Sequence, residues 1–526
     1  MRGNSLLAGV TVPVALLIIA SSGAQTAQAS LLSPRTAVVA PPGIPAEVLA
    51  PAGSEAGSSA QSIPTSFTGS LNSALGAAPL GSDVTGQVTD AATGAVLYSK
   101  STNRPQHPAS TIKILTAMAI LKALGPDARL STNVTFDSVS DQVVLHGAGD
   151  STLARVRSEA SSWPTGQSAR PATLSDLAVR TAAALHKAGA TNIHLALDDS
   201  LFVGSSLAPG WKPSFVTAGV VSPVMALSAD GGRVSASSNV RSEDPAKVAA
   251  DYFAGRLRAL GIKVAPIITR VANPVDSAGE SPTKPVTNTP TPMSTSVASA
   301  IAAPASAGAV SSGPSVPALM SPGDGSQAPA AAGPTVIASV QSPSIADLVE
   351  RMLTRSDDDL AEALGHLAGG KLVGSASFEG GVRATKDTLE QSGLSMKGMR
   401  LADASGLSSL NELDSATFTH ALSVVVANKP FTGSSVGTLW PVSSGLPIAG
   451  LTGTLSDRFT SAKTIRGRGV VRAKTGTLTG VIGLAGIVRD SHGRILIFDF
   501  DADHAPGPIA DARAAVDRAA TIVATS

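Results

Sequence analysis

The chain has 526 residues, a length that predicts two or three domains rather than one. Its 39 lysines and arginines nearly balance 38 aspartates and glutamates, and the basic residues are scattered, so we expect no nucleic-acid partner. The chain contains no cysteine, which excludes disulfides, thiol catalysis and cysteine-bound metal centres. A catalytic nucleophile would therefore be a hydroxyl, an amine or a carboxylate.

The N-terminus has the layout of a secretory signal. Arg2 precedes an apolar stretch over residues 6–20, and small residues then lead to the sequence Ala27-Gln28-Ala29. The apolar stretch is shorter than the ~20 residues that a membrane span needs. We predict a signal peptide over residues 1–29, with an uncleaved anchor as the alternative. Either form places the working domain outside the cytoplasm, in the cell envelope or secreted.

Two further segments have compositions typical of unstructured chain. Residues 30–65 alternate Ala, Pro, Gly and Ser and are predicted to form a disordered tether. Residues 273–336 share this bias, and between residues 281 and 335 the only charged residues are Lys284 and Asp324. Such a low-complexity segment cannot bury enough apolar surface to offset its ordering entropy.

The ordered part is predicted to open with two β-strands, over residues 83–89 and 95–99. A helix follows from Pro108, whose fixed φ suits a first turn, to about Leu124. Its apolar residues fall on nearly every side, so we expect it to be buried. Residues 130–272 mix short strands with helices and are interpreted as one or two α+β modules.

After the low-complexity segment, the pattern predicts two consecutive helices. Apolar residues between Ile345 and Leu353 recur at the spacing of an amphipathic helix, and Ser344 is a suitable N-cap. The polar tetrad Ser356-Asp357-Asp358-Asp359 interrupts this pattern before a second helical stretch, so we expect it at a junction between helices. The chain is predicted to close with three antiparallel strands and a helix, over residues 469–478, 483–488, 495–500 and 509–523.

An S-x-x-K motif, Ser110-Thr111-Ile112-Lys113, lies at the start of the predicted buried helix. A spacing of three residues places both side chains on one helix face, so that a neutral amine could accept the proton of the hydroxyl. Burial lowers the pKa of a lysine, as a general base requires. The pattern alone is weak, because Ser281-Pro282-Thr283-Lys284 also matches it inside the low-complexity segment.

A K-T-G sequence, Lys474-Thr475-Gly476, lies on the first strand of the predicted C-terminal meander. There an ammonium and a hydroxyl could hold a carboxylate, and an edge strand could pair with an extended peptide. The tripeptide alone is common and fits an ordinary solvated strand end better than a binding site. The order S-x-x-K, S-D-x, K-T-G along one chain is far more specific.

This ordered set resembles the D-alanyl-D-alanine carboxypeptidase/endopeptidase family, the low-molecular-mass class C penicillin-binding proteins. Residues 108–113 match the first motif of that family, and residues 472–477 match the third. Further similar segments are Gly149–Leu153, Pro209–Trp211, Asp403–Ser408 and Gly453–Leu455. The long interval between Ser110 and Ser356 resembles the family's habit of inserting domains between the first two motifs.

The resemblance implies an α+β fold, in which a penicillin-binding or β-lactamase-like transpeptidase domain carries inserted α+β modules. The transpeptidase-like domain would be an antiparallel sheet covered by helices. The first part of this domain is expected over residues 66–130 and its second part over residues 337–526. Between them we expect the inserted modules over residues 131–272 and the low-complexity segment over residues 273–336.

The resemblance also implies roles for residues of the three motifs. Ser110 would attack a D-Ala-D-Ala carbonyl of a peptidoglycan stem peptide, giving an acyl-enzyme that water hydrolyses. Lys113 would accept the proton, and Ser356 would relay a proton to the leaving amine. The residues expected to bind substrate are Asp358, Lys474, Thr475, Gly476 and Thr477. Backbone N–H groups of Ser110 and Thr477 would form the oxyanion hole, β-lactam antibiotics would inhibit, and no cofactor or metal is implied.

One residue departs from the family pattern. The second motif is Ser-Asp-Asn in the family, whereas Asp358 stands here in place of the asparagine. An ionised carboxylate only accepts hydrogen bonds, and it could pair with Lys113 and weaken the lysine as a base. The alternative function is therefore a catalytically weakened homologue that binds wall peptides or partner proteins. The aspartates could also serve only to stabilise a helix N-terminus.

A competing esterase hypothesis rests on Gly433-Ser434-Ser435-Val436-Gly437, followed by His492 or His504. That motif requires a strand, a sharp turn and then a helix, whereas residues 416–426 before it are predicted to be helical. The histidines form no H-x-x-H or H-E-x-x-H pattern, so we expect no zinc site.

Overall fold

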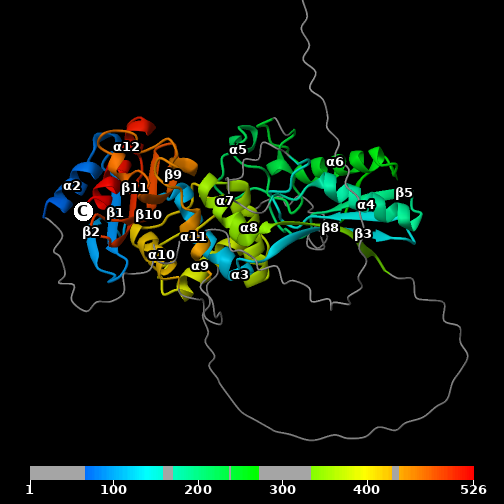
Figure 1. Cartoon of the computed structure of the whole chain (residues 1–526), viewed down its shortest axis with the longest axis horizontal. Coiled ribbons are helices and arrows are strands. Elements are labelled where there is room, and N and C mark those ends of the chain that lie inside the picture. Colours follow the sequence, from blue (N-terminus) through cyan, green and yellow to red (C-terminus); the bar gives the residue numbers. More distant parts are fainter. Residues whose placement is uncertain (1–64, 158–169, 236–237, 272–332, 429–437) are drawn as a thin grey trace, which may run out of the picture. The chain divides into compact units, whose positions relative to one another are not determined.

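The computed structural model describes residues 65–157, 170–235, 238–271, 333–428 and 438–526, which form two β-sheets and the helices packed on them (Figure 1). The predicted signal peptide, the tether up to residue 64, most of the low-complexity segment and the esterase-like motif lie outside these residues. Among the described residues, no helix is both long and apolar enough to cross a membrane.

The first sheet has five strands in the order β2-β1-β11-β10-β9, and every neighbouring pair is antiparallel. Its strands are β1 (Val84–Asp90), β2 (Val96–Lys100), β9 (Val471–Leu478), β10 (Val481–Arg489) and β11 (Ile495–Ala502). Strand β1 pairs with β11, so the N-terminal hairpin and the C-terminal meander form one sheet. The K-T-G sequence lies on β9, the edge strand.

Helices pack on both faces of this sheet. Alternate residues of β11 point to opposite faces. Phe498 and Phe500 join a core with α2 (Thr65–Leu75) and α12 (Ile509–Ala524), whereas Ile497 joins a core with α10 (Ser415–Ala427). The second core also contains the helices α3 (Lys113–Leu124), α7 (Ile345–Arg355), α8 (Asp358–Val373), α9 (Phe378–Gln391) and α11 (Trp440–Gly445).

The predicted buried helix begins as the 3-10 turn η2 (Ala109–Ile112) and continues as α3. All residues of α3 except Lys122 and Leu124 are buried, which confirms the prediction from its apolar pattern. Further short 3-10 segments in the described residues are η1 (Ala78–Leu80), η3 (Asp230–Gly232), η5 (Gly453–Leu455) and η6 (Ile465–Gly467).

The polar tetrad lies between two helices, as the sequence predicts. Ser344 begins α7 with a capping box that it forms with Asp347. The helix ends at Ser356, which has a left-handed φ of 56°. Asp357 then caps α8, because its carboxylate accepts the backbone N–H of Leu360 at 3.0 Å. The sharp turn presents Ser356 between two rigid helices.

The second sheet, which forms the inserted module, has the order β6-β5-β4-β3-β8, with β7 beside β5. Its strands are β3 (Arg129–Asp137), β4 (Gln142–His146), β5 (Asn192–Asp198), β6 (Lys263–Val264), β7 (Thr269–Arg270) and β8 (Thr335–Ser344). The helices of the module are α4 (Leu174–Ala188), the short α5 (Ser214–Thr217) and α6 (Pro245–Ala259). Helices α4 and α6 share an apolar core with this sheet.

The boundaries expected for the inserted module differ from those in the structure. Strand β8 pairs with β3 and buries Ala338 and Val340 in the core of the second sheet. The expected boundaries at residues 130/131 and 336/337 therefore cut through β3 and β8. The low-complexity segment interrupts the inserted module rather than ending it, because a strand of that module follows the segment.

Candidate active site

The S-x-x-K motif forms the turn that leads into α3, and we call residues 108–113 the nucleophile turn. The ammonium Nζ of Lys113 donates to Ser110 Oγ at 3.0 Å. The side chain of Lys113 is fully buried, whereas Ser110 is half-buried and keeps part of its surface open. The residue before it, Ala109, has a φ of 45°, a left-handed conformation that is rare for a residue with a Cβ. The turn thus holds a hydroxyl beside a buried amine.

Lys113 contacts three acceptors. Besides Ser110, its Nζ donates to Asp358 Oδ1 and to the backbone carbonyl of Ser405, both at 2.6 Å. Three acceptors match the three protons of an ammonium. The pair expected from the sequence between Asp358 and the lysine is therefore present. Burial raises the pKa of Asp358, and the positive charge of Lys113 opposes that rise.

A second lysine and serine lie beside the first pair. Lys474 is fully buried, and its Nζ donates to Ser356 Oγ and to the carbonyl of Thr475, both at 2.9 Å. Burial holds the pKa of Lys474 well below its usual range, and the positive charge of Lys113 lowers it further. A lysine with a depressed pKa can exchange a proton with the hydroxyl that it contacts.

Strand β9 packs closely against the nucleophile turn. A Cβ at Gly476 would lie 2.6 Å from the carbonyl oxygen of Pro108, so only glycine lets the strand approach this far. The space that the missing side chain leaves is thus filled by the nucleophile turn. Thr475 is hydrogen-bonded through its hydroxyl to that of Thr454 at 2.9 Å, and Thr477 is half-buried. The structure therefore brings together seven of the eight predicted site residues, and Thr477 follows Gly476 on the same strand.

Two contributors to the site carry no role in the sequence prediction. They are the backbone carbonyl of Ser405 and the hydroxyl of Thr454. Both lie in segments that resemble the family, 403–408 and 453–455, and that similarity was the available signal. A carbonyl group occurs in every residue, so its use as an acceptor could not be assigned from residue type.

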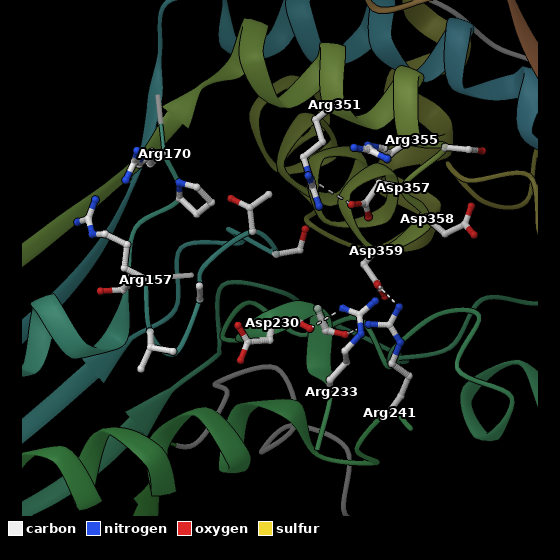
Figure 2. Close-up of a pocket in the computed structure, with 18 of the residues that line it drawn as sticks. Arg157, Arg170, Asp230, Arg233, Arg241, Arg351, Arg355, Asp357, Asp358 and Asp359 are labelled. Carbon is white, nitrogen blue, oxygen red and sulfur yellow. Dashed lines mark hydrogen bonds and ion pairs between the residues drawn. The ribbon is translucent and has the colours of Figure 1, made fainter. Parts of the chain in front are cut away.

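A cavity of about 620 Å³ adjoins Ser356 and Asp358, between the α7–α8 junction and loops of the inserted module (Figure 2). Arg241 forms an ion pair with Asp359 at 2.8 Å on one wall. Burial raises the pKa of Asp359 to about 7 although this arginine opposes the shift. The charged lining residues are Arg157, Arg170, Arg233, Arg241, Arg351, Arg355, Asp230, Asp357, Asp358 and Asp359. Arginines outnumber carboxylates, so the cavity favours an anionic group.

The residues of the competing hypotheses are placed elsewhere. His492 contacts the C-terminal carbonyl of Ser526 at 2.9 Å, and His504 lies 3.4 Å from Asp83. Neither histidine contacts the other, and Ser435 lies outside the described residues. Across the described part of the chain, no group of three or more His, Asp or Glu side chains is arranged to hold a metal ion.

The model of the D-Ala-D-Ala carboxypeptidase 3 (S13) family matches residues 67–243 and 322–523. Carboxypeptidase DacB of Mycolicibacterium smegmatis is 32% identical over 444 residues, which cover 84% of this chain and 80% of that protein. A carboxypeptidase of Mycobacterium tuberculosis is 31% identical over 443 residues, covering 83% of this chain and 79% of that protein.

The crystal structure of penicillin binding protein 4 from Haemophilus influenzae matches with a TM-score of 0.60 at 20% identity, covering 86% of this chain and 97% of that chain. A complex of the same protein with a β-lactam matches with a TM-score of 0.55, at the same identity and coverage. This likeness confirms the predicted α+β fold. The chain belongs to the D-Ala-D-Ala carboxypeptidase 3 (S13) family of penicillin-binding serine peptidases that act on peptidoglycan, and the enzyme class predicted from its motifs is confirmed.

Proposed function

We propose that Ser110 is the nucleophile that cleaves the terminal D-Ala-D-Ala bond of peptidoglycan stem peptides. The observation that carries this proposal is the 3.0 Å contact between Ser110 Oγ and the buried Lys113 amine. In the first step, Oγ bonds to the carbonyl carbon of the penultimate D-Ala while its proton passes to Lys113 Nζ, which must be neutral and so cannot at that moment donate to all three of its acceptors. In the second step water bonds to that carbon, one water proton passes through Ser356 to Lys474, and Lys113 returns its proton to Ser110 Oγ as the ester bond breaks.

The second serine and lysine serve the leaving group. The C–N bond breaks when the departing D-Ala amine receives a proton, and Ser356 Oγ is the donor that we assign to this step. Lys474 contacts that hydroxyl at 2.9 Å and replaces the proton. Lys474 and Thr475 also hold the terminal carboxylate of the substrate, and the N–H groups of Ser110 and Thr477 stabilise the oxyanion.

The arginine-rich cavity accounts for recognition of the rest of the stem peptide. It begins at Ser356 and Asp358, so a peptide whose scissile bond lies at Ser110 extends towards it. Stem peptides carry carboxylates beyond the D-Ala pair, and a guanidinium binds a carboxylate through two parallel hydrogen bonds. Arg233 and Arg241 lie on the wall that the inserted module contributes (Figure 2). We assign the cavity to an acidic group of the stem peptide.

Two further proposals concern inhibitors and location. A β-lactam carries a strained amide and a carboxylate in the positions of the D-Ala-D-Ala bond and its terminus, so it would acylate Ser110. The similar Haemophilus protein was crystallised with a β-lactam, which supports this expectation. The N-terminal signal pattern supports export to the cell envelope or beyond, where peptidoglycan lies.

The alternative, a weakened homologue that only binds wall peptides, draws on one observation. Asp358 forms an ion pair with Lys113 at 2.6 Å, and an amine that keeps its proton in that pair cannot accept one from Ser110. Release of D-Ala from an N-acetylated peptide ending in D-Ala-D-Ala separates the two functions. Turnover by the native protein that is lost in Ser110→Ala supports the enzyme. Peptide binding without D-Ala release would establish the weakened homologue.

A further inference from the structure

We propose that the inserted module positions the general base, because its Trp211 holds the loop whose carbonyl accepts from Lys113. We call residues 403–409 the Ser405 loop. The inference rests on the proposed role of Lys113 and adds a task for the inserted module. Trp211 is a positioning residue here, since its side chain contacts Asp403 and Phe378 and not Ser110 or Lys113.

The Ser405 loop is in direct contact with the catalytic groups. Its Ser405 carbonyl accepts from Lys113 Nζ at 2.6 Å, and its Ala404 carbonyl accepts from Thr116 of α3 at 2.8 Å. A Cβ at Gly406, whose φ is 88°, would lie 1.9 Å from the carbonyl oxygen of Ala109. The loop therefore lies directly against the nucleophile turn, and a displacement of the loop moves an acceptor of Lys113.

Two buried carboxylates give the loop its shape. Glu362 of α8 is fully buried and accepts the N–H groups of Ser405 at 2.8 Å and Ala404 at 3.2 Å. Asp403 is also buried and accepts the N–H groups of Gly406 at 2.9 Å and Ser408 at 2.7 Å. Burial raises the pKa of Glu362 well above its usual value, and the negative charge of Asp403 adds to the rise. A loop built around two neighbouring acids needs every donor that it has.

The inserted module supplies one of these donors. Trp211 Nε1 donates to Asp403 Oδ2 at 2.8 Å, and its ring packs edge-on against Phe378 of α9 with ring centroids 5.5 Å apart. Beside it, the hydroxyl of Ser408 donates to the carbonyl of Pro209 at 2.6 Å. A Cβ at Gly210, whose φ is 79°, would lie 2.5 Å from Ser408 Oγ, so glycine is required for this approach. Residues 209–211 thus form a clamp on the Ser405 loop.

The clamp can be weakened without detaching the module. Asp359 of α8 accepts the backbone N–H of Ser222 at 2.7 Å and pairs with Arg241 at 2.8 Å, and both of these contacts lie outside the clamp. Trp211→Phe keeps an aromatic ring beside Phe378 and removes the donor to Asp403. The perturbation therefore reaches Lys113 through the loop.

The test is the rate of acylation by a fluorescent penicillin, measured over a range of concentrations to separate the acylation rate constant from the dissociation constant of the non-covalent complex. In Trp211→Phe we expect the acylation rate constant, calculated for the fraction of protein that penicillin can label, to fall about tenfold. Small displacements at a reacting centre have large effects on rate. The dissociation constant should stay within about twofold. Ser408→Ala, which removes the second bond of the clamp, should change the same constant in the same direction.

Two further variants show whether the effect passes through the loop. In an Asp403→Ala background, Trp211→Phe should add less than a twofold effect, because the alanine already lacks the acceptor for Trp211 Nε1. Tyr98→Phe removes a comparable hydrogen bond, from Tyr98 to Asn72 at 2.8 Å in the other core of the catalytic domain, and should leave acylation unchanged.

The outcomes are distinct. A native protein that penicillin does not acylate would overturn the proposed function itself. Native acylation with an unchanged rate constant in both Trp211→Phe and Ser408→Ala would overturn only the positioning role. That role would also be overturned if the dissociation constant alone changed, or if the melting temperature fell while the rate constant held.

Discussion

Replacing Asp358 by asparagine should increase the rate of acylation. The carboxylate forms an ion pair with Lys113 Nζ at 2.6 Å, and a paired ammonium has no lone pair to accept the proton of Ser110. Asparagine keeps an acceptor for the lysine, removes the negative charge and provides a donor for a substrate amide. The substitution also restores the residue that the second motif has in the family.

The magnitude follows from the charge that is lost. A hydrogen bond to a charged group contributes about 1.5–3 kcal/mol and a neutral one about 0.5–1.5 kcal/mol, so the contact weakens by about 1–1.5 kcal/mol. Each 1.36 kcal/mol corresponds to about tenfold in rate, so a gain of roughly tenfold is expected near neutral pH. Because burial raises the pKa of Asp358, the carboxyl is increasingly protonated as the pH falls. The gain should therefore be smallest at pH 5 and increase towards neutral pH.

The assay compares D-Ala release and penicillin acylation by both proteins across pH 5 to 9. Asp347→Asn is the matched control, because it removes an acidic charge from α7 but keeps an acceptor for the N-cap Ser344, and Asp347 bonds Ser344 rather than Lys113. We expect less than a twofold change in the control. If Asp358→Asn slows the enzyme at every pH, the carboxylate takes part in catalysis, and the reasoning that treats it as a brake on Lys113 is refuted.

Four further predictions concern pH-dependent stability, packing, the low-complexity segment and processing. Burial raises the pKa of Asp501 to about 7, far above its unfolded value near 4. The folded protein therefore binds this proton more tightly than the unfolded chain does, and the resulting stability is present below pH 4 and is lost as the pH rises through 7. The melting temperature of Asp501→Asn should fall less steeply between pH 5 and 8 than that of the native protein. Identical slopes in the two proteins would contradict this prediction. Gly476→Ala should slow acylation by at least about tenfold, because its Cβ meets a carbonyl of the nucleophile turn at 2.6 Å, whereas Gly255→Ala, with open space at the Cβ, should not. Deleting residues 285–334 should leave labelling by penicillin nearly unchanged, because the free energy of loop closure changes by only about 0.6 kcal/mol per doubling of loop length. A melting temperature lower by many degrees would show that the segment packs. N-terminal sequencing of exported protein should begin at Ser30, and an intact N-terminus in the membrane would favour the anchor.

The elements that the sequence predicts best are those with an unbroken pattern. The apolar residues of α3 and the i, i+3, i+4 spacing of α7 both correspond to buried helices. The residues of the candidate active site could also be predicted from the order of the three motifs, because each motif contains a side chain with a specific chemical role. Ser110, Lys113, Ser356 and Lys474 do meet, although 364 positions separate the first from the last in the chain.

The parts that the sequence does not predict depend on backbone groups and on long-range pairing. Strand β8 pairs with β3 across the low-complexity segment, and its first residues share the composition of that segment. The carbonyl of Ser405 reaches Lys113 only because Glu362 and Asp403 fix the loop. The arginine-rich cavity combines residues of two modules whose relative placement no local pattern encodes.

The central claim is that Ser110, activated by Lys113, forms the acyl-enzyme. Its most direct test is mass spectrometric mapping of the protein after brief exposure to penicillin, with peptides from the native chain, Ser110→Ala and Ser435→Ala compared. The account predicts one penicilloyl group on the peptide that contains Ser110, its absence in Ser110→Ala and its persistence in Ser435→Ala. An adduct on Ser435, or on any other residue of a Ser110→Ala protein at the native rate, would contradict the account.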